Sequence, residues 1–517
     1  MRGKFSAGGW LEKRWHRGRV ALFAASLMSW HIPLYAAKWQ LHPTLLLGET
    51  YTDNVALAPP GREESDYVTE IDPGVSLHGE GGRIKLDLNY RLQNLIYAKD
   101  ATRNASNHQL AANGNAELVK DIFFVDARSS VSQQIVAANG RVGLDNLNIV
   151  NQADVYTYGF SPYLKLRLAS YAEAELRYSD DHVENQNTSI SDAESQQYSM
   201  HVNSGPRFDR LQWDAAFQQQ DLNLSKGEDS RYQSANADAR YRVLSAWNIL
   251  VRGGSEDNSL PNVNDPHNGS YWLAGLEWVP SPRFSASATA GGNNWAADLS
   301  LQPNDRTSLH VGYRDLDVGL VRGPSWNVLL SHSTRRTTWR ASYTEQHTTT
   351  QTLQLAGQQF FALVDSKGNP IVDPVSGLPI ILVRNVFSLT DEDFLQQRGQ
   401  ITVTMNTGKS DIVFGVFNER RTFSISNDSE EVSGTTASWT WRMEPRTSTL
   451  IGGGWQRRNP ANTDNHEDTW NGSIGLIRTI SERANASLVY SHLQHNTYIV
   501  AGDYGENRVA LQLNMRF

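Results

Sequence analysis

Alternation of apolar and polar residues with a period of two constrains this chain more than any other feature. The pattern recurs in segments 84–92, 172–178, 237–243, 309–314, 437–443 and 509–517. Neighbouring side chains of a β-strand point to opposite faces, so each segment has one apolar face and one strongly polar face. No segment after residue 37 keeps the helical period of about 3.6 residues. The chain is therefore expected to be all-β.

The first 37 residues have a different character. Residues 1–19 hold six basic residues against one acid, and an apolar run from Val20 to Trp30 follows, with Ala36 and Ala37 after it. This order is typical of a cleaved secretory signal peptide. A membrane anchor is the alternative, but the apolar run is shorter than the ~20 residues that a spanning helix needs. We expect residues 1–37 to direct export and residues 38–517 to form the mature protein.

Tight turns and longer polar loops alternate along the mature chain. The tight turns fall at 80–82, 120–121, 169–170, 209–210, 245–246, 281–282, 304–305, 335–336, 409–410, 445–446 and 481–482, and long loops such as 53–66, 180–194 and 256–268 lie between them. Outer-membrane barrels have short periplasmic turns and longer external loops. The turns predict about 24 strands, within a range of 22–26. The hairpin 283–302 has the shortest strands, and its loss would leave 22.

Composition excludes several other classes of protein. The chain has no Cys, which excludes disulfides, thiolate zinc sites, iron–sulfur clusters and a cysteine nucleophile. A mean hydropathy of -0.50 excludes a polytopic helical membrane protein. The net charge of -8 argues against nucleic acid as the main partner.

Lipid cannot satisfy unpaired backbone groups, so a spanning sheet must close on itself. We therefore predict a transmembrane antiparallel up-and-down β-barrel in a Gram-negative outer membrane, with its apolar face toward lipid. The strand pattern starts soon after residue 37, so neither a plug domain nor a periplasmic domain is expected. The polar face would line the lumen. Its charged side chains would pair with one another along a solvated wall or form rings of charge that select the solute. Its candidate residues are Lys85, Asp87, Arg91, Glu173, Glu175, Arg177, Asp238, Arg240, Arg242, Glu277, Arg314 and Arg340.

Several short motifs carry a resemblance to known proteins. The last strand, with Leu513, Met515 and Phe517 on its apolar register, resembles the signal that the barrel assembly machinery recognises. Tyr51-Thr52-Asp53-Asn54-Val55 is similar to a motif of large β-barrel porins. The same motif, together with Ile71-Asp72-Pro73-Gly74-Val75 and 331–339, supports a closer resemblance to one narrower family. The layout resembles the PEP-CTERM system-associated outer-membrane proteins. That resemblance implies a role in exopolysaccharide export or envelope biogenesis, with no established chemistry.

Other constellations favour structural interpretations. Asp53 and Asn54 suit a local turn in which side chains bond to backbone. His492 and His495 would lie on opposite faces of a strand, and neither they nor His182, His332 and His347 show convincing metal-ligand spacing. Ser331 and His332 would also point apart, and no nucleophile elbow is present. We therefore expect no metal, no cofactor and no catalysis.

The segment 351–393 is far longer than common connections. It holds two apolar runs, 360–364 and 380–383, around turn residues, which suggests a hairpin of its own. An extension of the barrel wall above the membrane is the favoured interpretation. A lid over the mouth, a segment packed in the lumen and a docking surface are the alternatives.

The leading functional hypothesis is a passive conduit or anchoring component linked to exopolysaccharide export or envelope biogenesis. The first alternative is a non-conducting surface scaffold or adhesin whose external loops bind a partner. A barrel-embedded enzyme is the third hypothesis. Expected partners are outer-membrane lipid, lipopolysaccharide, the barrel assembly machinery and polysaccharide or export components, with no nucleic acid.

Overall fold

The computed structural model describes residues 38–135, 140–148, 151–186, 190–260, 267–355, 360–362, 381–384, 392–461, 463, 465–498 and 502–517. Twenty-four long strands form one sheet, here called the wall. The first wall strands are β1 (Lys38–Thr52), β2 (Asp66–Glu80), β3 (Ile84–Tyr97), β4 (Ala105–Val119), β5 (Phe123–Ile135), β6 (Gln152–Leu168), β7 (Ala172–Asn185), β8 (Ala193–Ser204), β9 (Leu211–Leu224), β10 (Ser230–Leu244), β11 (Trp247–Glu256) and β12 (Gly269–Ser281).

The other wall strands are β13 (Phe284–Gly291), β14 (Asn294–Asn304), β15 (Thr307–Leu316), β16 (Gly323–Ser333), β17 (Thr337–Thr348), β20 (Phe394–Asn406), β21 (Ser410–Phe423), β22 (Ser429–Glu444), β23 (Thr447–Asn459), β24 (Glu467–Ser481), β25 (Ala484–Asn496) and β26 (Tyr504–Arg516). A short 3-10 helix, η1 (Ala101–Arg103), precedes β4. Between β17 and β20 lie the helix α2 (Thr350–Leu355) and the short strands β18 (Phe360–Ala362) and β19 (Ile381–Arg384).

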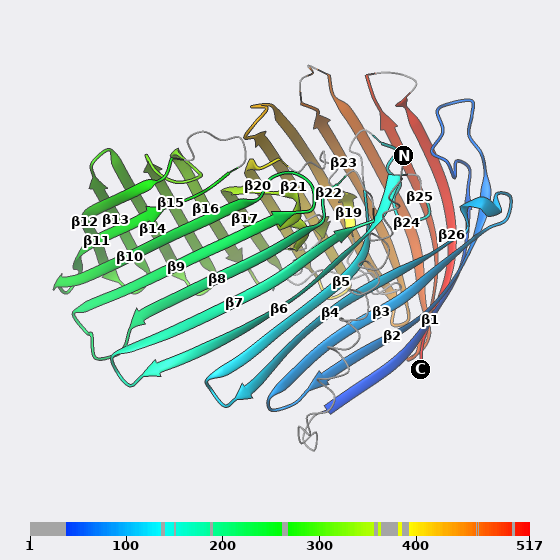
Figure 1. Cartoon of the computed structure of the whole chain (residues 1–517). Helices are drawn as coiled ribbons and strands as arrows, with labels where there is room; N and C mark the ends of the chain where they lie inside the picture. Colours follow the sequence, from blue (N-terminus) through cyan, green and yellow to red (C-terminus); the bar gives the residue numbers. More distant parts are fainter. Residues whose placement is uncertain are drawn as a thin grey trace, which may run out of the picture.

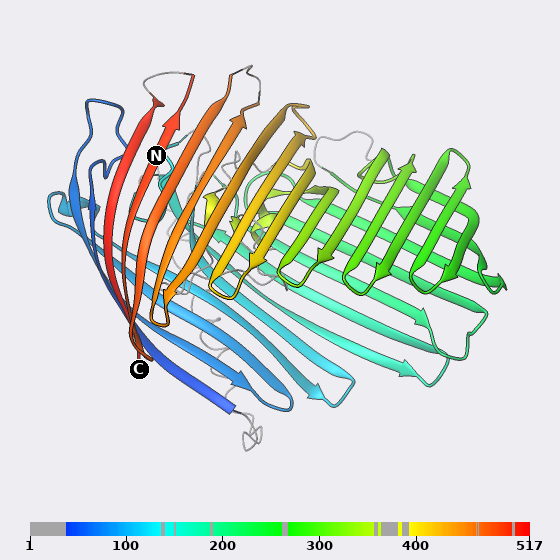
Figure 2. The ribbon, with the colours of Figure 1, turned by 180° about the vertical axis from the view of Figure 1, so that it is seen from behind.

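The wall is closed. β1 pairs with β2 on one side and with the last strand, β26, on the other, and every wall pairing is antiparallel. β17 pairs directly with β20 along its full length, so the intervening segment leaves the wall without a gap. Figures 1 and 2 show the tilted strands as one continuous wall with an elongated outline. Closure leaves the wall sheet with no exposed edge, as a membrane requires.

The two faces of the wall differ in chemistry as the alternation predicts. Outward positions carry large exposed apolar side chains, among them Trp272 at 60%, Leu276 at 53% and Leu511 at 58% exposure. An apolar surface of this extent is unfavourable in water and suits hydrocarbon. Aromatic rings cluster on this face, such as Trp247 with Trp278 and Tyr178 with Tyr198. Among the described residues, no helix is long and apolar enough to cross a membrane.

The turns follow the predicted alternation, and all of the predicted tight turns lie between consecutive wall strands. The weakest predicted hairpin is present as β13 and β14. Their pairing runs from Phe284 opposite Leu301 to Gly291 opposite Asn294. β13 is short because only eight residues separate its two turns. The start of β1 and the C-terminus lie near each other at one end of the wall (Figure 1).

The predicted fold is wrong in its interior. The sheet has the predicted number of strands, but the prediction of a barrel with no plug does not describe its interior, where connecting segments occupy part of the lumen. The described segment 140–148 and helix α2 instead pack against the inner face: Leu147 lies among Val68, Leu95 and Tyr97, and Leu355 packs against Val183 and its neighbours. The obstruction comes from connections within the barrel sequence, so an argument from the N-terminus could not detect it.

The favoured interpretation of the segment 351–393 is also wrong. β18 and β19 do pair as a hairpin, but they form a separate two-stranded sheet and do not extend the wall. β19 lies against β22 and β23, and both views place the hairpin within the outline of the barrel. The wall has no place for these strands because β17 and β20 already pair with each other.

Candidate functional site

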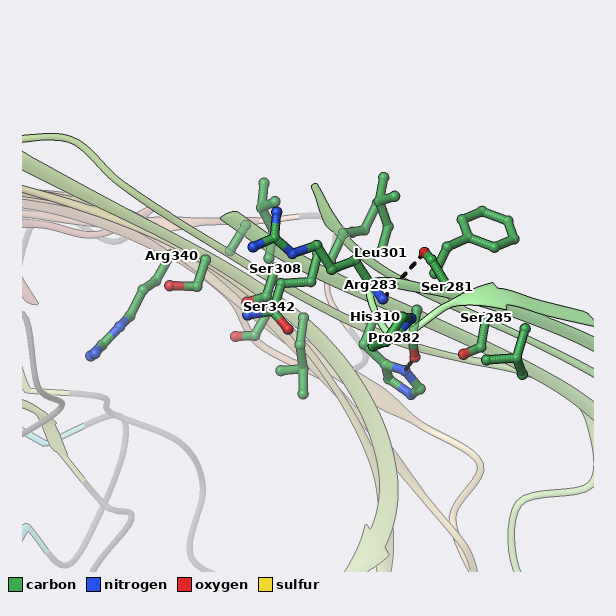
Figure 3. A pocket seen from close by; sticks show the side chains of 18 of the residues that line it. Ser281, Pro282, Arg283, Ser285, Leu301, Ser308, His310, Arg340 and Ser342 are labelled. Carbon is green, nitrogen blue, oxygen red and sulfur yellow. Dashed lines mark hydrogen bonds between the residues drawn. The ribbon is translucent and has the colours of Figure 1, made fainter. Parts of the chain in front are cut away.

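A cavity lies on the wall from β10 to β20. Its volume is about 760 Å³, and its lining includes Arg240, Glu277, Ser300, Ser308, His310 and Arg340. These residues share the lumen face because cross-strand register pairs Ser300 with His310 and keeps the alternation in phase around the wall. Figure 3 shows His310 and Arg340 projecting on one side of the wall, with Leu301 on the other. The cavity offers hydroxyl groups and a few charges beside apolar side chains such as Leu329.

Ion pairs hold the charged side chains of this cavity in place. Arg240 Nε lies 2.8 Å from Glu277 Oε2, and Asn248 donates to the same carboxylate at 2.8 Å. Arg252 bridges two acids, with 2.9 Å to Asp238 and 2.9 Å to Asp298. Such pairs present fixed dipoles of both signs to the lumen, which suits a neutral polar solute better than a free ion.

Two further cavities adjoin the first. One of about 660 Å³ is lined by Asp214, Asp238 and Arg252, and one of about 520 Å³ is lined by Asp209 and Arg242. Arg240 lines all three, so they adjoin one another along the wall, and we call this group of cavities the narrow lobe of the lumen.

Helix α2 separates the narrow lobe from the rest of the lumen. On one side, Leu353 is buried against Phe394 of β20 and Phe423 of β21. On the other side, Gln354 donates to Gln134 of β5 at 3.1 Å and to Asn185 of β7 at 3.3 Å. The helix thus bridges strands that are distant in the wall order.

A second bridge lies beside α2. Tyr232 of β10 donates a hydrogen bond to Asp393, the residue before β20. The Tyr232 ring also lies 6.3 Å from that of His347 on β17, and His347 contacts Ser424 Oγ at 3.0 Å. Burial raises the pKa of Asp393 to about 6, with a smaller contribution from Glu392, while hydrogen bonds from Tyr232 and Ser230 oppose the shift.

The other part of the lumen, which we call the wide lobe, is filled at its outer end by residues 140–148. Asp145 lies 2.6 Å from Arg508 of β26, which also contacts Glu506 at 2.7 Å. Asn148 donates to the Val55 carbonyl at 2.9 Å, and Tyr97 donates to the Leu147 carbonyl at 2.5 Å. These contacts join the segment to β3, to the β1–β2 loop and to β26.

The Tyr51, Asp53, Asn54 and Val55 motif lies where the first and last strands meet. The backbone nitrogen and the side-chain nitrogen of Asn507 on β26 each donate a hydrogen bond to the Asp53 carboxylate, at 2.7 Å. Asn54 is buried and bonds to Ala58, which is the local turn expected, and it also donates to the Gly505 carbonyl at 2.9 Å. The motif therefore closes the wall in addition to forming a turn.

The C-terminal assembly-signal candidates lie at the same junction. Leu513 and Met515 face outward and pair with Leu47 and Leu45 of β1, and the Phe517 amide donates to the Pro43 carbonyl at 2.9 Å. Phe517 remains 59% exposed. Recognition of this strand by the assembly machinery stays a prediction.

The predicted lumen residues all share the inward register. The narrow half holds those of β10, β12, β15 and β17, namely Asp238, Arg240, Arg242, Glu277, Arg314 and Arg340, together with Glu173 of β7, which lines the second cavity. The wide half holds the others of β3 and β7, namely Lys85, Asp87, Arg91, Glu175 and Arg177. Several are paired, such as Arg177 with Asp126 at 2.7 Å and Asp87 with His78 at 2.5 Å. Their role in selectivity stays a prediction.

Sequence reasoning missed a buried charged row on β20 to β24. Arg421 lies 2.9 Å from Glu419, and Arg458 bridges Glu430 at 2.6 Å and Glu467 at 2.9 Å. Arg420 and Arg421 are adjacent, so the sequence alone did not show which charge faces inward. The row borders β19, which lies against β22 and β23.

The register places His492 and His495 on opposite faces of the wall, as expected, and it does the same for Ser331 and His332. His495 faces inward and contacts Thr469 at 2.8 Å, whereas His492 faces outward and contacts Asn507 at 2.9 Å. Ser331 pairs with Arg340 on the inner face, and His332 bonds to Thr307 on the outer face. Ser331 and His332 are therefore not a nucleophile and its base.

Comparison with family models finds no match, and neither does comparison with curated proteins. Similar solved structures include the FrpB iron transporter from Neisseria meningitidis, with 10% identity and a TM-score of 0.47 over 94% of this chain and 83% of that chain. The siderophore receptor PirA from Acinetobacter baumannii has 10% identity and a TM-score of 0.45 over 92% and 80% of the two chains. PirA from Pseudomonas aeruginosa has 8% identity and a TM-score of 0.42 over 92% and 80%.

The chain's own strand order and surface chemistry define its class. A closed antiparallel sheet of 24 strands with an apolar exterior and a polar interior is an outer-membrane-type β-barrel, located in a Gram-negative outer membrane.

Proposed function

We propose that this barrel is a passive conduit for a hydroxyl-rich solute and that the path runs through the narrow lobe. The observation that carries the proposal is the group of adjoining cavities around Arg240, whose lining includes hydroxyl groups and paired charges. Hydroxyl donors and acceptors on the wall match those of a sugar chain. The conduit needs no chemical step.

An exopolysaccharide is the solute class that fits both this lining and the resemblance to PEP-CTERM system-associated proteins. Membership of that family, a role in envelope biogenesis, and contacts with lipopolysaccharide, the assembly machinery and export components are parts of the same proposal. An anchoring role within an export assembly would use the same barrel.

The chain lacks cysteine, so single cysteines permit a direct test. Ser308 faces the narrow lobe and its neighbour Leu309 faces outward. In planar bilayers, a charged thiol reagent should reduce the conductance of Ser308→Cys. The same reagent should leave Leu309→Cys unchanged. Equal responses would contradict the assigned path.

A third cysteine separates the two lobes. Ser473 of β24 faces the wide lobe, where residues 140–148 fill the outer end. Its modification in Ser473→Cys should leave the conductance unchanged. A stronger block from Ser473→Cys than from Ser308→Cys would move the path to the wide lobe and overturn the proposal.

A non-conducting surface scaffold is the second candidate, and the two bridges across the lumen favour it. Residues 140–148 and α2 both place buried chain inside the barrel. If the folded, heat-modifiable protein gives no conductance above that of detergent alone, the scaffold becomes the better account.

A further inference from the structure

We propose a divalent transition-metal site on the outer face of the wall, formed by Asp180 and His182 of β7 and Glu194 of β8. One ligand atom from each residue lies within 4.8 Å of the other two. The site lies outside the lumen, so the proposal does not depend on conduction.

Strand geometry brings these residues together. Asp180 and His182 are two positions apart on one strand and therefore share a face. Register pairs His182 directly with Glu194 on the adjacent strand. Glu194 follows His182 by twelve positions in the chain, so spacing in the sequence did not indicate the cluster.

The site lies just beyond the aromatic residues of the outer face. Tyr178 stands two positions before Asp180 on β7, and its cross-strand partner on β8 is Tyr198, with ring centroids 5.1 Å apart. The Tyr158 ring stacks on His182 at 5.0 Å, and Tyr158 donates to Glu184 at 2.9 Å. Stacking on Tyr158 restricts the plane of the imidazole.

One ligand atom is already shielded from solvent without a hydrogen-bond donor. Asp180 Oδ1 is buried and accepts no hydrogen bond, although His182 Nε2 lies 3.4 Å away. A desolvated carboxylate oxygen without a donor is costly. A cation between this oxygen, the imidazole and Glu194 would satisfy it.

The local charge is also negative. Within the described residues, no Lys or Arg forms an ion pair with Asp180, Glu184 or Glu194. One imidazole and two carboxylates suit a transition-metal ion with positions left for water, since imidazole binds such metals better than it binds calcium or magnesium.

The test uses the mature chain, residues 38–517, refolded in detergent and freed of metal with a chelator. Titration with Zn²⁺ should show one saturable site per chain and a rise in the thermal unfolding midpoint. His182→Asn and Glu194→Gln should each weaken binding at least about tenfold and remove the thermal shift.

His78→Asn is the matched control, because His78 pairs with Asp87 at 2.5 Å in the lumen without a third ligand in the cluster. It should bind Zn²⁺ as the unaltered protein does. Heat-modifiable gel mobility verifies that each variant folds. The proposal is overturned if the unaltered protein shows no saturable binding, or if His78→Asn weakens binding as much as His182→Asn.

Discussion

Tyr232 of β10 donates a hydrogen bond to Asp393, which precedes β20, and this contact joins two stretches of wall that are not neighbours in the sheet. Helix α2 bridges the lumen beside this bond, with contacts to β20 and β21 on one side and to β5 and β7 on the other. These contacts connect opposite parts of the wall through the lumen, which would otherwise be wide enough to stay open.

Removing this bond should destabilise the barrel. Tyr232→Phe leaves the buried Asp393 carboxyl with fewer donors, which costs about 1–3 kcal/mol. The urea concentration at the unfolding midpoint should fall. Tyr241→Phe on the same strand changes an outward side chain that is 46% exposed, and it should have no effect.

Titration of Asp393 should make the stability of the folded barrel depend on pH. Its pKa in the folded protein is about 6, above the ordinary 3.8, so the folded barrel binds this proton more tightly than the unfolded chain does. The resulting stabilisation is present below pH 3.8 and is lost as the pH rises through about 6. Unfolding midpoints measured from pH 4 to 7.5 should therefore fall, and the fall should be smaller in Asp393→Asn. An identical slope in both proteins would contradict the assignment.

The register of β3 predicts opposite outcomes for adjacent positions. Leu88 faces outward and pairs with Leu77, whereas Asn89 is exposed on the inner face. An arginine facing lipid near the midplane costs ~2–4 kcal/mol, so Leu88→Arg should hinder assembly and Asn89→Arg should not. Heat-modifiable mobility distinguishes the two variants, and equal effects would contradict the assigned faces.

Deletion of residues 352–387 should increase conductance, because it removes most of α2 together with its contact to Phe394 and Phe423. The wall should remain intact, since β17 and β20 pair directly. Single-channel recording gives the answer, and an unchanged conductance would show that α2 does not obstruct the path.

The protein freed of residues 1–37 should require detergent to remain dispersed. Its outer face exposes residues such as Trp272, Leu276 and Leu511, which would associate in water. Light scattering during detergent removal measures this directly. A monodisperse protein in plain buffer would exclude a lipid-facing exterior.

The sequence by itself determined the strands, the turns and which face of each strand meets lipid, because alternation and turn residues are local and a one-residue slip reverses every side chain. It could therefore place Asp238, Arg240 and Glu277 on the inner face. Only the tertiary structure decided which of these residues meet and what fills the lumen. Strand register brings Arg240 to Glu277 and His182 to Glu194. Packing of the segment 140–148 brings Asp145 to Arg508. Such contacts depend on the register between strands and on the packing of loops, and no periodicity along the chain encodes them.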